Sequence, residues 1–77
     1  MAIVHDFELD VRGEACPYPL IRTKQQVDKL QKRQVLKVLA NDPVAPQNID
    51  AWAKKSGNEL LEVEVIRGDY CIFVRKS

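Results

Sequence analysis

The segment FELDVRGEACPYP, residues 7–19, joins a strand pattern to the start of a helix. Apolar and acidic side chains alternate through residues 7–11, which is the period of a strand with one buried face. Pro17 and Pro19 suit the first turn of a helix, because an N–H there would have no partner within the helix. The segment therefore predicts a strand, a short loop and a helix in direct succession.

The thiol of Cys16 lies where the predicted loop meets the predicted helix. A helix start carries unpaired N–H groups and a partial positive charge, so a thiolate there is favoured over the neutral thiol. A residue before proline is pushed towards extended geometry, which suits Cys16 as the N-cap. The N–H groups of Tyr18 and Leu20 are then the best candidates to face the sulfur. Cys16 is a candidate nucleophile, and the alternative is a cysteine that fills a small apolar space.

Further elements follow from the spacing of apolar residues. An amphipathic helix is predicted over about 17–31, and a buried strand over 35–40 is ended by the turn residues 41–43. A second helix follows and stops at Gly57-Asn58, which favours a left-handed conformation. The apolar stripes of the two helices are Leu20, Thr23, Val27 and Leu30, and Ala45, Ile49, Trp52, Ala53 and Ser56.

The chain is predicted to end in a hairpin. Leu61, Val63 and Val65 alternate with glutamates, and Gly68-Asp69 offers a two-residue turn before a second alternating run. Right-handed crossovers would then give an α/β (α+β) fold, a two-layer βαβαββ sandwich whose four-stranded mixed sheet carries two helices on one face. Cys16 would lie at the edge where ligand chemistry collects in such sheets. We expect the open face to be mostly charged, at Lys37, Glu62, Glu64 and Arg75.

Length and composition restrict the classes of function. The 77 residues, 45% of them hydrophobic, predict a single domain over 1–77 with one small core. A net charge of +1 gives no global reason to expect nucleic-acid or membrane binding. No segment has transmembrane length, and the N-terminus lacks a leader pattern. Cys16 and Cys71 fit neither a C-x-x-C nor a zinc spacing. We expect a soluble cytoplasmic protein without metal, cofactor or cleaved leader.

The pattern Leu9-Asp10-x-x-Gly13-x-x-Cys16-Pro17-x-Pro19 resembles the TusA/SirA/YedF group of small sulfur carrier proteins. The resemblance continues through Lys24, Asp42-Pro43, Ile49 and Gly57, and so covers nearly the whole chain. It implies the βαβαββ fold and a Cys16 that accepts sulfur as a persulfide and passes it to another protein. It also implies a donor, either a cysteine desulfurase or a rhodanese-like protein, and a downstream acceptor in tRNA thiolation, cofactor assembly or sulfur metabolism. Such a protein is a relay carrier with sulfurtransferase-type chemistry rather than a stand-alone turnover enzyme.

The candidate site is one thiol and its surroundings. Arg12 and Lys24 can support the sulfur anion electrostatically and Glu14 opposes it, although each can equally be a solvated surface charge. The site residues are Cys16 as the persulfide-forming nucleophile, Pro17 and Pro19, which shape the helix start, and Arg12, Gly13, Tyr18 and Lys24 in supporting positions.

Two other functions remain open. A monothiol redox protein would use Cys16 with glutathione or with Cys71, although Pro19 replaces the second cysteine of the glutaredoxin C-P-Y-C motif. Cys71 itself fits a structural strand residue. An RNA-binding or protein-binding module would leave Cys16 structural and use the cations of the first helix, but these are scattered and aromatic residues are few. Those cations are Arg22, Lys24, Lys29, Lys32 and Arg33.

Overall fold

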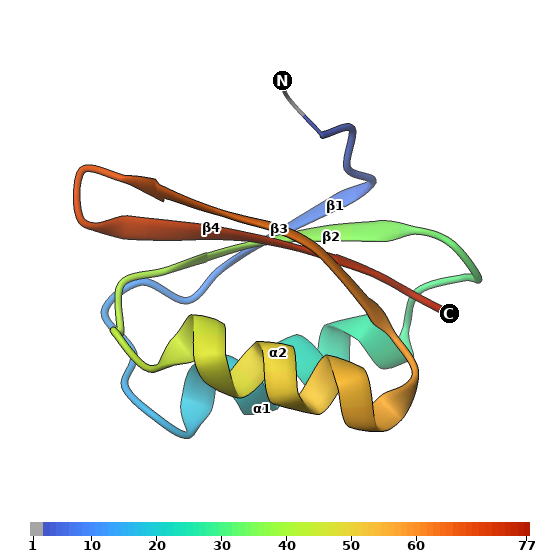
Figure 1. The fold of residues 1–77 in the computed structure, drawn as a ribbon, viewed down its shortest axis with the longest axis horizontal. Coiled ribbons are helices and arrows are strands. Elements are labelled where there is room, and N and C mark those ends of the chain that lie inside the picture. The colour runs from blue at the N-terminus through green and yellow to red at the C-terminus, as the bar shows by residue number, and fades with distance from the viewer. Residues whose placement is uncertain (1–2) are drawn as a thin grey trace.

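The computed structural model describes residues 3–77 and contains two helices and a four-stranded sheet. The strand order is β1-β2-β4-β3; β1 and β2 are parallel, and β4 is antiparallel to both of its neighbours. Both helices cover one face of the sheet (Figure 1), so the predicted two-layer βαβαββ fold is confirmed. The elements are β1 (Phe7–Asp10), α1 (Tyr18–Asp28), β2 (Val35–Ala40), α2 (Ala45–Ser56), β3 (Glu59–Ile66) and β4 (Asp69–Arg75).

The main core lies between the sheet and the helices. It consists of the inward residues of the central strands β2 and β4 and the apolar stripes of the helices, as expected from their periods of two and three to four residues. Thr23 is buried among them, and its hydroxyl donates a hydrogen bond to the Pro19 carbonyl over 2.7 Å. The most deeply buried residues include Val11, Val27, Leu36, Val38, Ile49, Ile72 and Val74.

Helix α1 is shorter than the predicted range of 17–31, and its N-cap is Pro17 rather than Cys16. The N–H of Tyr18 bonds to the carbonyl of Ala15 over 3.0 Å, which closes a turn just before the helix. At the other end, the N–H groups that follow the helix bond to carbonyls three residues back, so the last turn is tighter than a regular one. The prediction of Cys16 as the N-cap is therefore wrong by one residue.

The hairpin between β3 and β4 turns at Arg67-Gly68, one residue earlier than predicted. Both residues have a positive φ, 52° and 84°, as a type I′ turn requires. Glycine adopts this conformation without steric cost, and Asp69 is left to pair with Ile66 at the start of β4.

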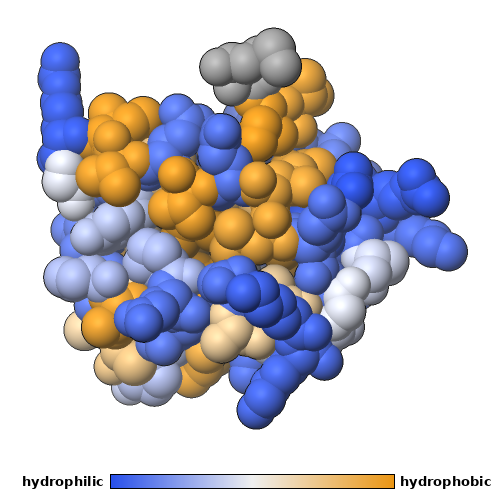
Figure 2. Space-filling model, viewed as in Figure 1, coloured by the Kyte–Doolittle hydropathy of each residue, from blue (hydrophilic) through white to orange (hydrophobic). Residues whose placement is uncertain are grey.

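Strand β3 contains an irregularity that the alternating sequence does not reveal. The register with β4 shifts between Leu60 and Glu62, so Leu61 packs on the open face. Val63 pairs with a core residue of β4 and faces the helix layer, which breaks the predicted single-faced run of residues 61, 63 and 65. Val63 and Val65 remain 36% and 66% exposed. Figure 2 shows hydrophobic residues gathered mostly in the upper half of the face that it presents.

The open face of the sheet is less charged than expected. Phe73 and Cys71 are 4% and 6% exposed, and with Val35 they form a second, smaller apolar cluster. Ile3 packs against this cluster, and Figure 1 shows the N-terminal segment on the side of the sheet away from the helices. The open face is therefore apolar at this cluster, and the expectation of a mostly charged face holds only for the part of the face that surrounds it.

Within residues 3–77, neither helix has the length and apolar character needed to cross a lipid bilayer.

Candidate functional site

Cys16 lies in the loop between β1 and α1, at the edge of the sheet where the parallel strands β1 and β2 end. Its thiol is free and the residue is exposed. The loop between β2 and α2 leaves the same edge, because β1 and β2 are parallel neighbours. The peptide bond between Cys16 and Pro17 is cis. The predicted nucleophile is thus exposed at the predicted edge.

Two side chains of the β2–α2 loop hold the loop that carries the thiol. The carbonyl oxygen of the Asn41 side chain accepts the N–H of Gly13 over 2.9 Å. A carboxylate oxygen of Asp42 accepts the N–H of Cys16 over 2.6 Å, and its other oxygen accepts the N–H of Val44 over 3.3 Å. Gly13 has a φ of +86°, a conformation that favours glycine. The backbone around the sulfur is therefore fixed from the neighbouring loop.

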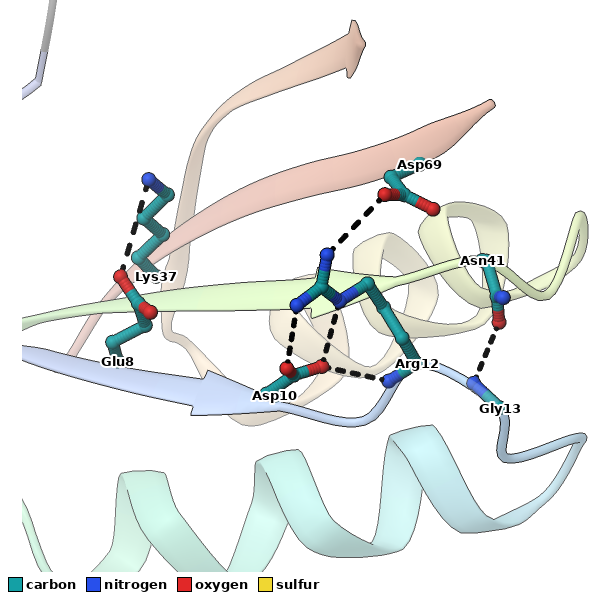
Figure 3. A network of polar contacts seen from close by, with 7 residues as sticks. All are labelled: Glu8, Asp10, Arg12, Gly13, Lys37, Asn41 and Asp69. Atoms are coloured by element: carbon teal, nitrogen blue, oxygen red, sulfur yellow. Dashed lines mark hydrogen bonds and ion pairs between the residues drawn. The ribbon is translucent and has the colours of Figure 1, made fainter. Parts of the chain in front are cut away.

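Arg12 ties the end of β1 to the start of β4 (Figure 3). Its guanidinium donates to both carboxylate oxygens of Asp10, over 3.0 and 2.8 Å, and to Asp69 over 3.4 Å. Hydrogen bonds from the side chain and backbone of Arg12 lower the pKa of Asp10 from 3.8 to about 2. The same contact with Asp10 raises the pKa of Arg12. Arg12 thus lies among carboxylates at the start of the loop of residues 11–17, the thiol loop, which carries Cys16.

We expect Asp10→Asn to lower the unfolding temperature at neutral pH. Because folding lowers the pKa of Asp10, the stability that its carboxylate contributes is present above its usual pKa and is lost as the pH falls from about 4 to about 2. Thermal unfolding followed by circular dichroism should show a gap between wild type and variant that closes over this range. Asp28→Asn, on the exposed face of α1, should show no such closing gap. If the difference in unfolding temperature between wild type and Asp10→Asn stayed the same at every pH, the ion pair of Asp10 and Arg12 would not have this role.

The contacts of the sulfur differ from those expected. The N–H of Tyr18 is bonded to the carbonyl of Ala15, so it does not face the sulfur as predicted, and Tyr18 is 58% exposed. Instead, the side-chain amide of Asn48 in α2 donates a hydrogen bond to Sγ of Cys16 over 3.5 Å. Sequence reasoning missed Asn48. The available signal was the parallel pairing of the first two strands, which brings their following loops together.

The charges around the thiol are distributed over several elements. Glu14, predicted to oppose the anion, is paired with Arg22 over 2.6 Å. Lys24 lies on α1 and lines a groove between the helices, together with Asn48 and Trp52. The groove has a volume of about 270 Å³. Lys24 therefore borders the same groove as the side chain that contacts the sulfur.

Asp42→Asn is expected to increase the reactivity of Cys16. The amide oxygen can still accept the N–H of Cys16, but the negative charge next to the residue that bears the sulfur is removed. Repulsion of about 1 kcal/mol between exposed charges 4 Å apart corresponds to a change of up to about fivefold in the ionised fraction. Alkylation of Cys16 by iodoacetamide at mildly acidic pH should be faster in the variant, and equal or slower alkylation would count against this electrostatic role.

The sequence matches the profile of the family described as "Sulfurtransferase TusA" over residues 7–76. It is 40% identical over 72 residues to the sulfur carrier protein TusA of Allochromatium vinosum, covering 94% of this chain and 95% of that protein. It is 39% identical over 75 residues to a putative sulfur carrier protein of Aquifex aeolicus, covering 97% of this chain but only 38% of that longer relative.

The fold has a counterpart among solved structures. The crystal structure of a SirA-like protein from Desulfitobacterium hafniense superposes with a TM-score of 0.77. The match covers 91% of this chain and 96% of that one, at 27% sequence identity. Sequence and structural comparisons thus point to the same group of proteins.

Proposed function

The chain belongs to the TusA family of sulfur carrier proteins, and on this basis we propose that Cys16 carries the sulfur as a persulfide. The observation that carries the proposal is an exposed thiol held in a loop at the sheet edge by Asn41 and Asp42. An exposed sulfur on a fixed backbone can meet a cysteine of another protein without unfolding of the carrier. Pro17 and Pro19 restrict the backbone beside it.

In the loading step, the Cys16 thiolate attacks the outer sulfur of a donor persulfide. A new bond forms between Sγ of Cys16 and that sulfur, and the sulfur–sulfur bond of the donor breaks. The donor cysteine leaves as a thiolate, and the proton of the donor persulfide stays on the transferred sulfur. The exchange needs no added oxidant, because one sulfur–sulfur bond replaces another. A cysteine desulfurase or a rhodanese-like protein can supply the donor persulfide.

In the release step, an acceptor thiolate attacks the outer sulfur of the Cys16 persulfide. The acceptor gains the persulfide and Cys16 leaves as a thiolate, ready for another cycle. Attack on the inner sulfur would instead expel sulfide and leave a mixed disulfide between the two proteins. Productive relay therefore requires that the acceptor reach the outer sulfur, which an exposed Cys16 permits.

The positions of the two cysteines favour carriage over dithiol redox chemistry. Cys71 is buried in the cluster on the open face of the sheet, whereas Cys16 is exposed in the loop before α1. A resolving thiol acts by attacking the neighbouring sulfur, and a buried thiol within a strand is poorly placed to do so. A persulfide on Cys16 would therefore survive until an acceptor protein arrives.

Mass spectrometry of the intact protein and its peptides tests this proposal. After incubation with a cysteine desulfurase, pyridoxal phosphate and cysteine, we expect a gain of one sulfur atom that maps to Cys16 and is removed by dithiothreitol. Incubation without the desulfurase is the control. In a parallel incubation that also contains a glutathione redox buffer, a glutathione adduct on Cys16, or an internal disulfide with Cys71, obtained in place of the added sulfur would overturn the proposal in favour of redox function.

A further inference from the structure

The side-chain amide of Asn48 reaches the sulfur from the neighbouring helix. Its Nδ2 lies 3.5 Å from Sγ of Cys16, although 32 positions separate the two residues. Asn48 lies in the first turn of α2, where its backbone N–H donates to the carbonyl of Val44 over 3.0 Å, so the helix fixes where the side chain begins. We propose, as an extension of the function proposed above, that Asn48 stabilises the Cys16 thiolate during the relay.

The backbone N–H groups of Cys16 and Tyr18 donate to other acceptors than the sulfur. The N–H of Cys16 itself donates to Asp42, and that of Tyr18 donates to a loop carbonyl. The two prolines that flank Tyr18 have no N–H to offer. A thiolate only accepts hydrogen bonds, so an amide N–H that points at the sulfur favours the ionised form over the thiol. Asn48 thus supplies a donor from outside the loop.

This contact acts on both halves of the relay. The Cys16 thiolate is the nucleophile during loading and the leaving group during release. In the loaded state, Sγ is a neutral sulfur bonded to a second sulfur, which accepts a hydrogen bond more weakly. Asn48 therefore stabilises the unloaded thiolate relative to the persulfide, and a less basic thiolate is also the better leaving group.

The charges around Asn48 explain why a neutral amide suits this position. Asp42 already places a carboxylate beside Cys16, while Glu14 is compensated by Arg22. Lys24 and Lys55 line the same groove as Asn48. A second carboxylate at position 48 would remove the hydrogen-bond donor and repel the thiolate, so aspartate is expected to be worse than alanine.

The test is the rate of Cys16 alkylation by iodoacetamide as a function of pH, in wild type, Asn48→Ala and Asn48→Asp. Loss of a hydrogen bond to an anion should reduce ionisation by about tenfold at this exposed site. Because nucleophilicity increases with basicity, with a Brønsted coefficient of about 0.4–0.5, the alanine variant should react about threefold more slowly at low pH and up to about threefold faster on the high-pH plateau. The aspartate variant should shift further in the same direction. Gln47→Ala, at the exposed neighbouring position of α2, should match wild type.

Two results would overturn the inference: a profile of Asn48→Ala that coincides with wild type, or a rate that falls by the same factor at every pH, which would mean that access to the sulfur had changed. Alanine has a higher helix propensity than asparagine, so α2 should persist, and circular dichroism checks this. Sulfur loading of the same proteins is measured in parallel. If wild type and variant both load while the profile is unmoved, only the role of Asn48 fails. If wild type does not load, the proposed function fails.

Discussion

Cys16→Ser is expected to abolish sulfur relay from a cysteine desulfurase to an acceptor protein. Serine keeps the size and exposure of the side chain, but its hydroxyl is not ionised near neutral pH and forms no stable bond to sulfane sulfur. The substrate of the desulfurase is cysteine labelled with radioactive sulfur. The label can then be followed onto carrier and acceptor on non-reducing gels. The label on the acceptor should fall to the level seen without carrier.

Cys71→Ala provides the matched control for this relay. Cys71 is 6% exposed and packs on the open face of the sheet, so its loss should weaken packing without removing the sulfur-bearing atom. This variant should still label the acceptor. If relay survived in Cys16→Ser but were lost in Cys71→Ala, the sulfur-carrying residue would be Cys71 and not Cys16.

Leu36→Ala is expected to remove a large part of the stability of the fold. Leu36 is fully buried in the central strand β2 and belongs to the core between sheet and helices. Truncating a buried leucine costs about 2–5 kcal/mol, whereas a chain of this length has a total stability of roughly 4–12 kcal/mol. The unfolding temperature should fall by roughly 10–30 °C, since each kcal/mol corresponds to several degrees in a domain of this size.

Val65→Ala is the control for this loss. Val65 also lies in a strand but is 66% exposed, so its truncation should change the unfolding temperature by only a few degrees. The unfolding temperatures of both variants are measured by calorimetry or circular dichroism. Equal effects of the two substitutions would contradict the assignment of the core.

The fold could be predicted because the sequence patterns of the single elements agree with one another. Alternation through residues 7–11, the buried run at 35–40 and the glycine stop at Gly57 each indicate an element that the structure contains. Handedness of the crossovers then leaves one arrangement of the helices. The position of Cys16 at the edge of the sheet also follows from this order of elements, whereas its exposure is seen only in the structure.

The details that were missed depend on contacts between distant residues. The shift in β3 that turns Leu61 to the open face accompanies its pairing with β4, and Ile3 packs on that face against residues far from it in the sequence. Helix α1 begins late because Tyr18 bonds back to the loop. The contacts of Asn41, Asp42 and Asn48 with the thiol loop join two loops that are separate in the sequence, and periodicity within one element carries no information about them.

Single-turnover transfer from isolated, persulfidated carrier tests the central claim most directly. Carrier labelled with radioactive sulfur on Cys16 is freed of donor, mixed with an acceptor protein and quenched at intervals, and the label on each protein is counted. We predict that every labelled sulfur lost from Cys16 appears on a cysteine of the acceptor, and that the carrier thiol is regenerated at the same rate. Loss of the label as free sulfide, with the acceptor unlabelled or bound to Cys16 through a disulfide, would contradict the account.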